Sequence, residues 1–230
     1  MNLRRLLLLS PWLWAGWPLG VGAQTPPTPA EAAHYGGLHA AAWQGDAARI
    51  AQLLAAGADP NPRDGHGRTP LHLATFARRR EAIRALVKGG ADLGALENDR
   101  YDAVTIAAVA DDEETLALLL QLGASARLIT SRYDGTALIA AAHLGHDGVV
   151  RQLIAAGAPL DHVNNLHWTA LIESIVLGQG GPRHVATLQA LVRAGANTQL
   201  ADRSGRTPLQ LARERGYQPM VEILLKAGAR

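Results

Sequence analysis

The sequence predicts an all-α repeat solenoid made of six helix-loop-helix units. Three observations predict it: a Gly-Ala dipeptide that recurs at a nearly constant interval, a helix-capping residue before each dipeptide, and an apolar stripe of helical spacing between the two. Intervals of this size are typical of stacked supersecondary units. The glycines of the dipeptides are Gly57, Gly90, Gly123, Gly157, Gly195 and Gly228, so the successive intervals are 33, 33, 34, 38 and 33 residues.

The first helix of each unit is predicted from its capping residue. Thr, Asp and Gly are all favoured at the N-cap. Thr69 and Thr207 are each followed by proline, which is favoured at the first helical position. A short helix should therefore begin after each cap. The six predicted N-caps are Gly36, Thr69, Asp102, Thr136, Thr169 and Thr207.

The second helix of each unit is predicted from an apolar triad at i, i+3 and i+4, which forms one stripe along a helix. The glycine of each Gly-Ala pair then follows the helix, where a left-handed conformation is needed to end it. The six triads are Ile50-Leu53-Leu54, Ile83-Leu86-Val87, Leu116-Leu119-Leu120, Val150-Leu153-Ile154, Leu188-Leu191-Val192 and Val221-Leu224-Leu225.

The segments between units are predicted to be turns. "DPNPRDGHGR" at 59–68 and "NTQLADRSGR" at 197–206 are rich in Asp, Asn, Pro and Gly. No unit can bury its apolar stripe alone, so stacking must create one continuous core. With 48% hydrophobic but only 4% aromatic residues, that core is expected to be small and aliphatic.

These motifs resemble the ankyrin repeat family. "DGHGRTPLHLA" at 64–74 and "DRSGRTPLQLA" at 202–212 are close to its signature, and the likeness covers about residues 34–230. The resemblance implies β-hairpin fingers at right angles to the helices and a concave groove that binds proteins. The third unit departs from the pattern with "YDAVTIAA". The expected units are about 34–66, 67–99, 100–133, 134–166, 167–204 and 205–230.

The N-terminus is predicted to be a secretory signal peptide, residues 1–23. "MNLRR" is a short basic start, an apolar run broken by proline follows, and small residues precede Gln24. We expect cleavage after Ala23, with a retained membrane anchor as the alternative. Residues 24–33 then form a Pro-rich linker. The predicted location is the periplasm, with secretion as the alternative, and no stable membrane insertion after cleavage.

Composition excludes several kinds of site. The chain has no Cys, which excludes disulfides, thiolate zinc sites and a thiol nucleophile. A formal net charge of +2 gives no reason to expect a nucleic-acid partner. The nine His are scattered and none forms a pair with a carboxylate at metal-ligand spacing. We therefore expect no metal, no cofactor, no catalytic residues and no enzymatic activity.

The fifth unit carries an insertion, "QGGPR" at 179–183, between its two helices. His184 then corresponds to the His of the preceding repeat. Glu173 stands where the other units have apolar residues, and a buried carboxylate requires a partner. We expect Glu173, Arg183 and His184 to anchor the insertion, because the loop N–H groups and Arg183 could pair with the carboxylate. The alternative is Glu173 as a general base beside His184 or His143.

The residues just before the N-caps, together with neighbouring finger residues, are predicted to form a binding ladder beside the groove. Aromatic and Arg side chains are enriched at interface hot spots. The alternative is that the aromatics cover the finger joints while the charges are solvated. The ladder comprises Arg68, Arg100, Tyr101, Arg132, Tyr133, His167, Trp168 and Arg206.

The function expected from these features is that of an exported, non-enzymatic scaffold. It would bind another protein through the groove and fingers, as a monomer. The alternative is a peptide or small-ligand receptor that uses the fifth-unit insertion. A ligand that binds only the native state would raise its apparent stability, which separates the two.

Overall fold

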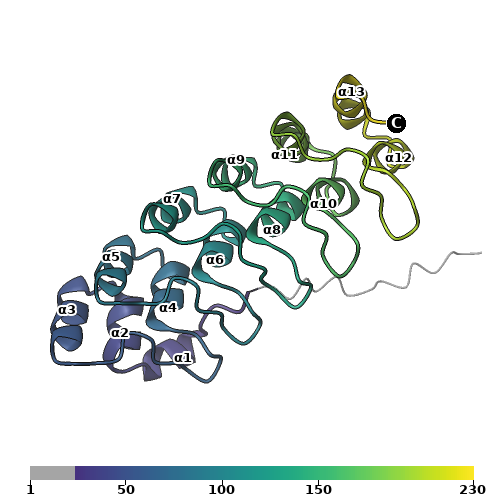
Figure 1. Ribbon diagram of the computed structural model, residues 1–230. Coiled ribbons are helices and arrows are strands. Elements are labelled where there is room, and N and C mark those ends of the chain that lie inside the picture. The colour runs from purple at the N-terminus through teal and green to yellow at the C-terminus, as the bar shows by residue number, and fades with distance from the viewer. Residues whose placement is uncertain (1–23) are drawn as a thin grey trace, which may run out of the picture.

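The computed structural model describes residues 24–230, which form two rows of antiparallel helices stacked into an elongated array (Figure 1). Across these residues, no helix is long and apolar enough to cross a membrane. The first row contains α2 (Gly37–Gln44), α4 (Pro70–Phe76), α6 (Ala103–Val109), α8 (Ala137–Leu144), α10 (Ala170–Val176) and α12 (Pro208–Glu214). The second row contains α3 (Ala47–Ala55), α5 (Arg80–Lys88), α7 (Glu113–Gln121), α9 (Asp147–Ala155), α11 (Pro182–Arg193) and α13 (Gln218–Lys226).

The predicted caps are confirmed. Each first-row helix begins directly after its expected N-cap, and the side chains of Asp102, Thr136 and Thr169 accept a bond from the backbone N–H three residues later. After each second-row helix the predicted glycine has a positive φ, from 78° at Gly157 and Gly228 to 97° at Gly123. The alanine that follows each glycine donates to a carbonyl five residues back, which closes the helix end.

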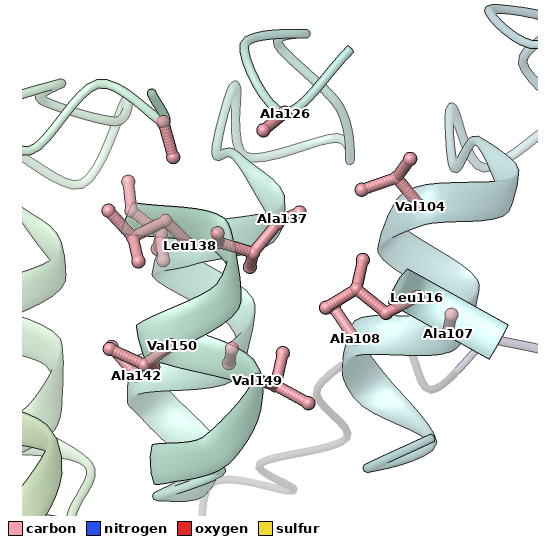
Figure 2. Packing of buried hydrophobic residues seen from close by; sticks show 14 of the residues in the cluster. Val104, Ala107, Ala108, Leu116, Ala126, Ala137, Leu138, Ala142, Val149 and Val150 are labelled. Atoms are coloured by element: carbon pink, nitrogen blue, oxygen red, sulfur yellow. The ribbon is translucent and has the colours of Figure 1, made fainter. Parts of the chain in front are cut away.

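The core is one continuous cluster of Ala, Leu, Ile and Val that runs through all six units. Figure 2 shows Ala137 and Val149 of the fourth unit pointing toward the third unit. The small alanines of the first-row helices let neighbouring helices approach closely, and the triads of the second row fill the remaining space, except that Leu225 of the sixth triad is 47% exposed. Burying these stripes drives the stacking, at roughly 25 cal/mol per Å² of apolar surface.

The fingers are hairpin loops between successive units, and we number them by their closing residues: 64–68, 97–101, 130–135, 164–168 and 202–206. A backbone bond closes each finger. The expected β-hairpins are reduced to these closures, because in residues 24–230 the single bridge is Thr130–Gly135 and there is no longer strand. Backbone bonds also join neighbouring fingers, as from the N–H of Asn165 to the carbonyl of Tyr133 at 3.0 Å.

The segment expected to be a linker is partly helical. α1 (Pro29–His34) begins with a capping box in which the Thr28 hydroxyl and the Glu31 carboxylate each accept from the other's backbone N–H. Glu31 also binds Arg68 of finger 1 at 2.8 Å, so the segment is docked on the first unit. The predicted signal peptide, residues 1–23, lies outside the described residues.

The insertion lengthens the second helix of the fifth unit. α11 has 12 residues, whereas each of the other second-row helices has nine. It begins at Pro182, so only part of the insertion remains a loop. The sixth unit closes that loop: Tyr217 donates to the carbonyl of Gly178 at 3.0 Å and Arg215 to that of Ile175 at 3.0 Å.

Candidate partner-binding surface

The first finger does not offer Arg68 to a partner. The residue is 1% exposed, and its guanidinium donates to Asp64 at 2.7 Å, Glu31 at 2.8 Å and the carbonyl of Thr25 at 3.1 Å. The expectation that Arg68 belongs to an exposed ladder is wrong. The docked N-terminal segment covers this side chain, and its position could not be read from the repeat pattern.

Two ion pairs join fingers 2 and 3. Arg100 pairs with Asp134 at 2.8 Å, and Arg132 pairs with Asp99 in the opposite direction. Both arginines are exposed, yet each already has a carboxylate partner. Tyr101 is 7% exposed, so it is not a surface aromatic, whereas Tyr133 is half-buried.

Finger 4 presents three exposed or half-exposed side chains in sequence. Leu166 and His167 are exposed, and His167 has a φ of 62°, a left-handed conformation that turns the loop. Trp168 is half-buried against the core and keeps part of its ring at the surface. On finger 5, Arg206 is exposed and pairs with Asp202 at 2.7 Å and Glu214 at 3.2 Å.

Apolar side chains on fingers 3 and 4 were not anticipated as a site. Ile129, Val163 and Leu166 are 48%, 43% and 39% exposed. Ile129 and Val163 occupy equivalent positions, immediately before the closing residue of each finger. Together with Trp168 we call these residues the finger 3–4 patch. The sequence signal was available, since the equivalent position in finger 1 is Arg63. Contiguous apolar patches on a protein surface mark interaction sites, whereas single exposed apolar residues are normal.

Glu173 does not anchor the insertion, which corrects that expectation. Its carboxylate accepts from the side-chain amide of Asn164 at 2.8 Å, and its other oxygen lies 3.4 Å from Nδ1 of His143. Glu173 is 5% exposed, so these contacts satisfy a buried charge. Glu173 therefore supports finger 4, at the end of the unit opposite to the insertion.

Arg183 does anchor the insertion, but to earlier units. It makes two bonds to the carboxylate of Asp111, at 2.8 and 3.0 Å, and one to Asp147 at 3.1 Å. These hydrogen bonds from Arg183 lower the pKa of Asp111. The side chain thus links the fifth unit to the fourth and the third.

His184 does not contact Glu173, whereas Nδ1 of His143 lies 3.4 Å from its carboxylate. The Nε2 of His184 bonds to the backbone carbonyl of His143 at 2.9 Å, as the ring of His146 bonds to the carbonyl of Ala108 one unit earlier. Both rings thus satisfy carbonyls near the ends of first-row helices. In the part of the chain described, no three His, Asp or Glu residues are grouped as a metal would require.

Family comparisons cover most of the chain. A family model described as ankyrin repeats in three copies matches residues 38–130, and a model of a single ankyrin repeat matches residues 133–165 and 204–230. The segment between the last two matches contains the fifth unit with its insertion.

Individual relatives are similar over nearly their whole lengths. A putative ankyrin repeat protein of Escherichia coli K12, YahD, is 35% identical over 190 residues, which is 82% of this chain and 94% of that protein. The crystal structure of an ankyrin repeat domain from Acinetobacter baumannii is 43% identical with a TM-score of 0.79, covering 84% of this chain and 98% of that one.

A third similarity is to a chain in a solved complex. That structure holds a predatory endopeptidase of Bdellovibrio bacteriovorus bound to an immunity protein. The match is 25% identical with a TM-score of 0.68, and it covers 84% of this chain and 98% of the other.

Proposed function

Because the chain belongs to the ankyrin repeat family, we propose that it is an exported, non-enzymatic scaffold that holds a partner protein against its fingers and groove. The observation that carries the proposal is the finger 3–4 patch on a rigid stack. Ankyrin repeat domains are generally protein–protein interaction modules. Fold alone does not assign a function, so the argument rests on this surface.

Two features support a protein as the partner. The patch combines exposed aliphatic side chains with an aromatic ring that is already held by the core, and rigid aromatic anchors contribute strongly to interfaces. The neighbouring fingers are fixed to one another by backbone bonds, so little conformational entropy is lost when a partner binds. The similarity to a chain from an endopeptidase–immunity complex is consistent with a polypeptide partner.

The proposal is tested by affinity capture from the native cell envelope with matched surface variants. Val163→Asp and Leu166→Asp place charges in the finger 3–4 patch. The control is Leu225→Asp, which replaces a residue 47% exposed on α13, away from the fingers. We expect the two patch variants to lose a partner that the wild type and the control retain, with all melting temperatures alike. A partner retained by both patch variants would refute the proposed surface.

A further inference from the structure

Fingers 1 and 5 share one arrangement around an aspartate. Oδ1 of Asp202 accepts from the backbone N–H groups of Ser204 and Arg206, both at 2.9 Å, and Oδ2 binds the guanidinium of Arg206. Asp64 makes the same contacts with finger 1 and with Arg68. One carboxylate thus holds the turn and also binds the arginine that precedes the helix.

Finger 4 separates the group that holds the turn from the negative charge. Asn164 replaces the aspartate, and its Oδ1 accepts from the N–H groups of Leu166 and Trp168, both at 3.0 Å. Its Nδ2 donates to Glu173 at 2.8 Å. The negative charge has therefore moved from the finger to α10, into a position where the second and sixth units have leucine, Leu73 and Leu211.

This displacement fixes the orientation of the Asn164 amide. An amide has one acceptor oxygen and one donor nitrogen, and only the oxygen can receive the two finger N–H groups. Without Glu173 the buried Nδ2 would lack an acceptor, which is unfavourable, and a flipped amide would place Nδ2 against those N–H groups. The Glu173 carboxylate excludes the flipped orientation.

The move of the negative charge to α10 also changes which residue can stand just before the N-cap of that helix. Arg68 and Arg206 each fold back onto the aspartate of their own finger. Asn164 is neutral and offers no such partner, and the position holds Trp168 instead. Finger 4 is consequently without an arginine–aspartate pair of its own, and its surface is aromatic and aliphatic.

Three arginines of the surrounding fingers already bind groups of the protein. Arg100 and Arg132 bind carboxylates of the adjacent finger, and Arg203 donates to the carbonyl of Asn165 at 3.1 Å. A charged partner segment would lose its hydration against the apolar side chains of the finger 3–4 patch. An uncharged, apolar segment has no such cost and gains the burial of the finger 3–4 patch.

We propose that Glu173 is a positioning residue, which holds finger 4 through Asn164 so that the finger 3–4 patch receives an uncharged, apolar segment of a partner polypeptide. The inference rests on the proposed function for the identity of the ligand class. The positioning role of Glu173 stands on the hydrogen bonds alone and is tested separately.

The positioning role is tested by hydrogen exchange at the amides of Leu166 and Trp168. Glu173→Leu introduces the residue found in the second and sixth units. It should accelerate exchange by about tenfold, the equivalent of one buried hydrogen bond. Glu173→Gln keeps an acceptor and should preserve the protection. The double variant Asn164→Asp/Glu173→Leu recreates the arrangement of fingers 1 and 5 and should restore it.

The single variant Asn164→Asp adds a test of how protection depends on pH. It places two carboxylates within hydrogen-bond distance, so it should lower protection at pH 7 and recover as one of them is protonated in acid. If Glu173 had only a general structural role, amide protection would neither recover in acid nor be restored by the double variant. Unchanged exchange in Glu173→Leu, or a double variant that exchanges as fast as that single variant, would overturn the positioning role.

The ligand class is tested with three labelled peptides of equal length by fluorescence anisotropy. One alternates Val and Thr, and in the others Lys or Glu replaces Thr. The neutral peptide should bind the wild type and Leu225→Asp most tightly, lose about tenfold in affinity with Glu173→Leu, and regain it with the double variant. Tighter binding of a charged peptide, or no binding of any, overturns the ligand class, whereas envelope capture tests the proposed function independently.

Discussion

Arg183 in the insertion forms a two-bond ion pair with Asp111, 72 residues earlier in the chain, across the whole of the intervening unit. A third bond joins the same guanidinium to Asp147 in that intervening unit. The insertion thereby connects three successive units, although stacking alone brings only neighbours into contact. Its position near the loops of earlier units follows from the extra turn at the start of α11.

Replacing Arg183 with Met should lower the free energy of unfolding by about 1 kcal/mol, because half-exposed ion pairs contribute little individually. The measurement is urea denaturation at low and high salt. Salt screens such pairs, so the difference from wild type should shrink at high ionic strength. Arg193→Met, at an exposed position of the same helix, is the control. A deficit equally large at high salt would contradict an electrostatic role.

His72 should make stability depend on pH. Burial lowers the pKa of His72 to about 4 from 6.5, although the bond from its ring to the carbonyl of Ala95 acts in the opposite direction. The unfolded chain therefore binds a proton that the native chain excludes. Stability from this residue is complete above pH 6.5 and falls as the pH is lowered to about 4, by roughly 3 kcal/mol in total.

The matched variant for that prediction is His72→Gln. Gln210 occupies the same position in α12, where its Oε1 accepts from the N–H of Thr207 at 2.8 Å. His72→Gln should remain folded at pH 7 and show a flatter dependence of the unfolding midpoint between pH 6.5 and 4. Identical slopes for both proteins in that interval would show that His72 is protonated in the folded protein as well, and that folding does not lower its pKa.

Arg68→Ala should release α1 from the first finger. It removes a buried cation that holds Glu31, Asp64 and the carbonyl of Thr25, and loss of one member of a buried pair costs about 3–5 kcal/mol. Proteolysis should then cut residues 24–34 first, with the remaining units intact. Arg206→Ala, which removes an exposed pair, is the control. Equal resistance of the segment in both variants would contradict the docking role.

Acid should release the same segment in the wild type. The pKa of Glu31 is lowered to about 2 by the backbone N–H of Thr28, then by the Thr28 hydroxyl and by Arg68. The contribution of Glu31 to the stability of the docked segment is therefore complete above pH 4.5 and is lost as the pH falls toward 2. Proteolysis of residues 24–34 with an acid-tolerant protease should rise over this interval, and Glu31→Gln should remove the dependence.

Export should yield a mature chain that begins at Gln24. The measurement is the intact mass of the protein recovered from the periplasmic fraction and from the medium. Replacing Ala23 with a bulky residue should block processing, since signal peptidases read small residues at that position. A mature chain that still begins at Met1 would favour the retained anchor.

The sequence by itself determined the local features of this protein. The N-caps, the left-handed glycines, the helix stripes and the number of units all depend on residues a few positions apart, whose spacing is visible in the chain. The aliphatic core also followed, because each stripe has an equivalent in the next unit. The binding surface was predicted only in part: Trp168 and His167 lie on finger 4, but Ile129 and Val163 were missed.

Only the tertiary structure decided which polar groups meet. Arg68 is buried because α1 folds onto it, Glu173 binds Asn164 rather than the insertion, and Arg183 reaches Asp111. These pairs join residues from different parts of the chain, and the spacing of the repeat does not say which of them meet. Hydrogen bonds require a few tenths of an ångström and a correct direction, and the stacking of the units sets both.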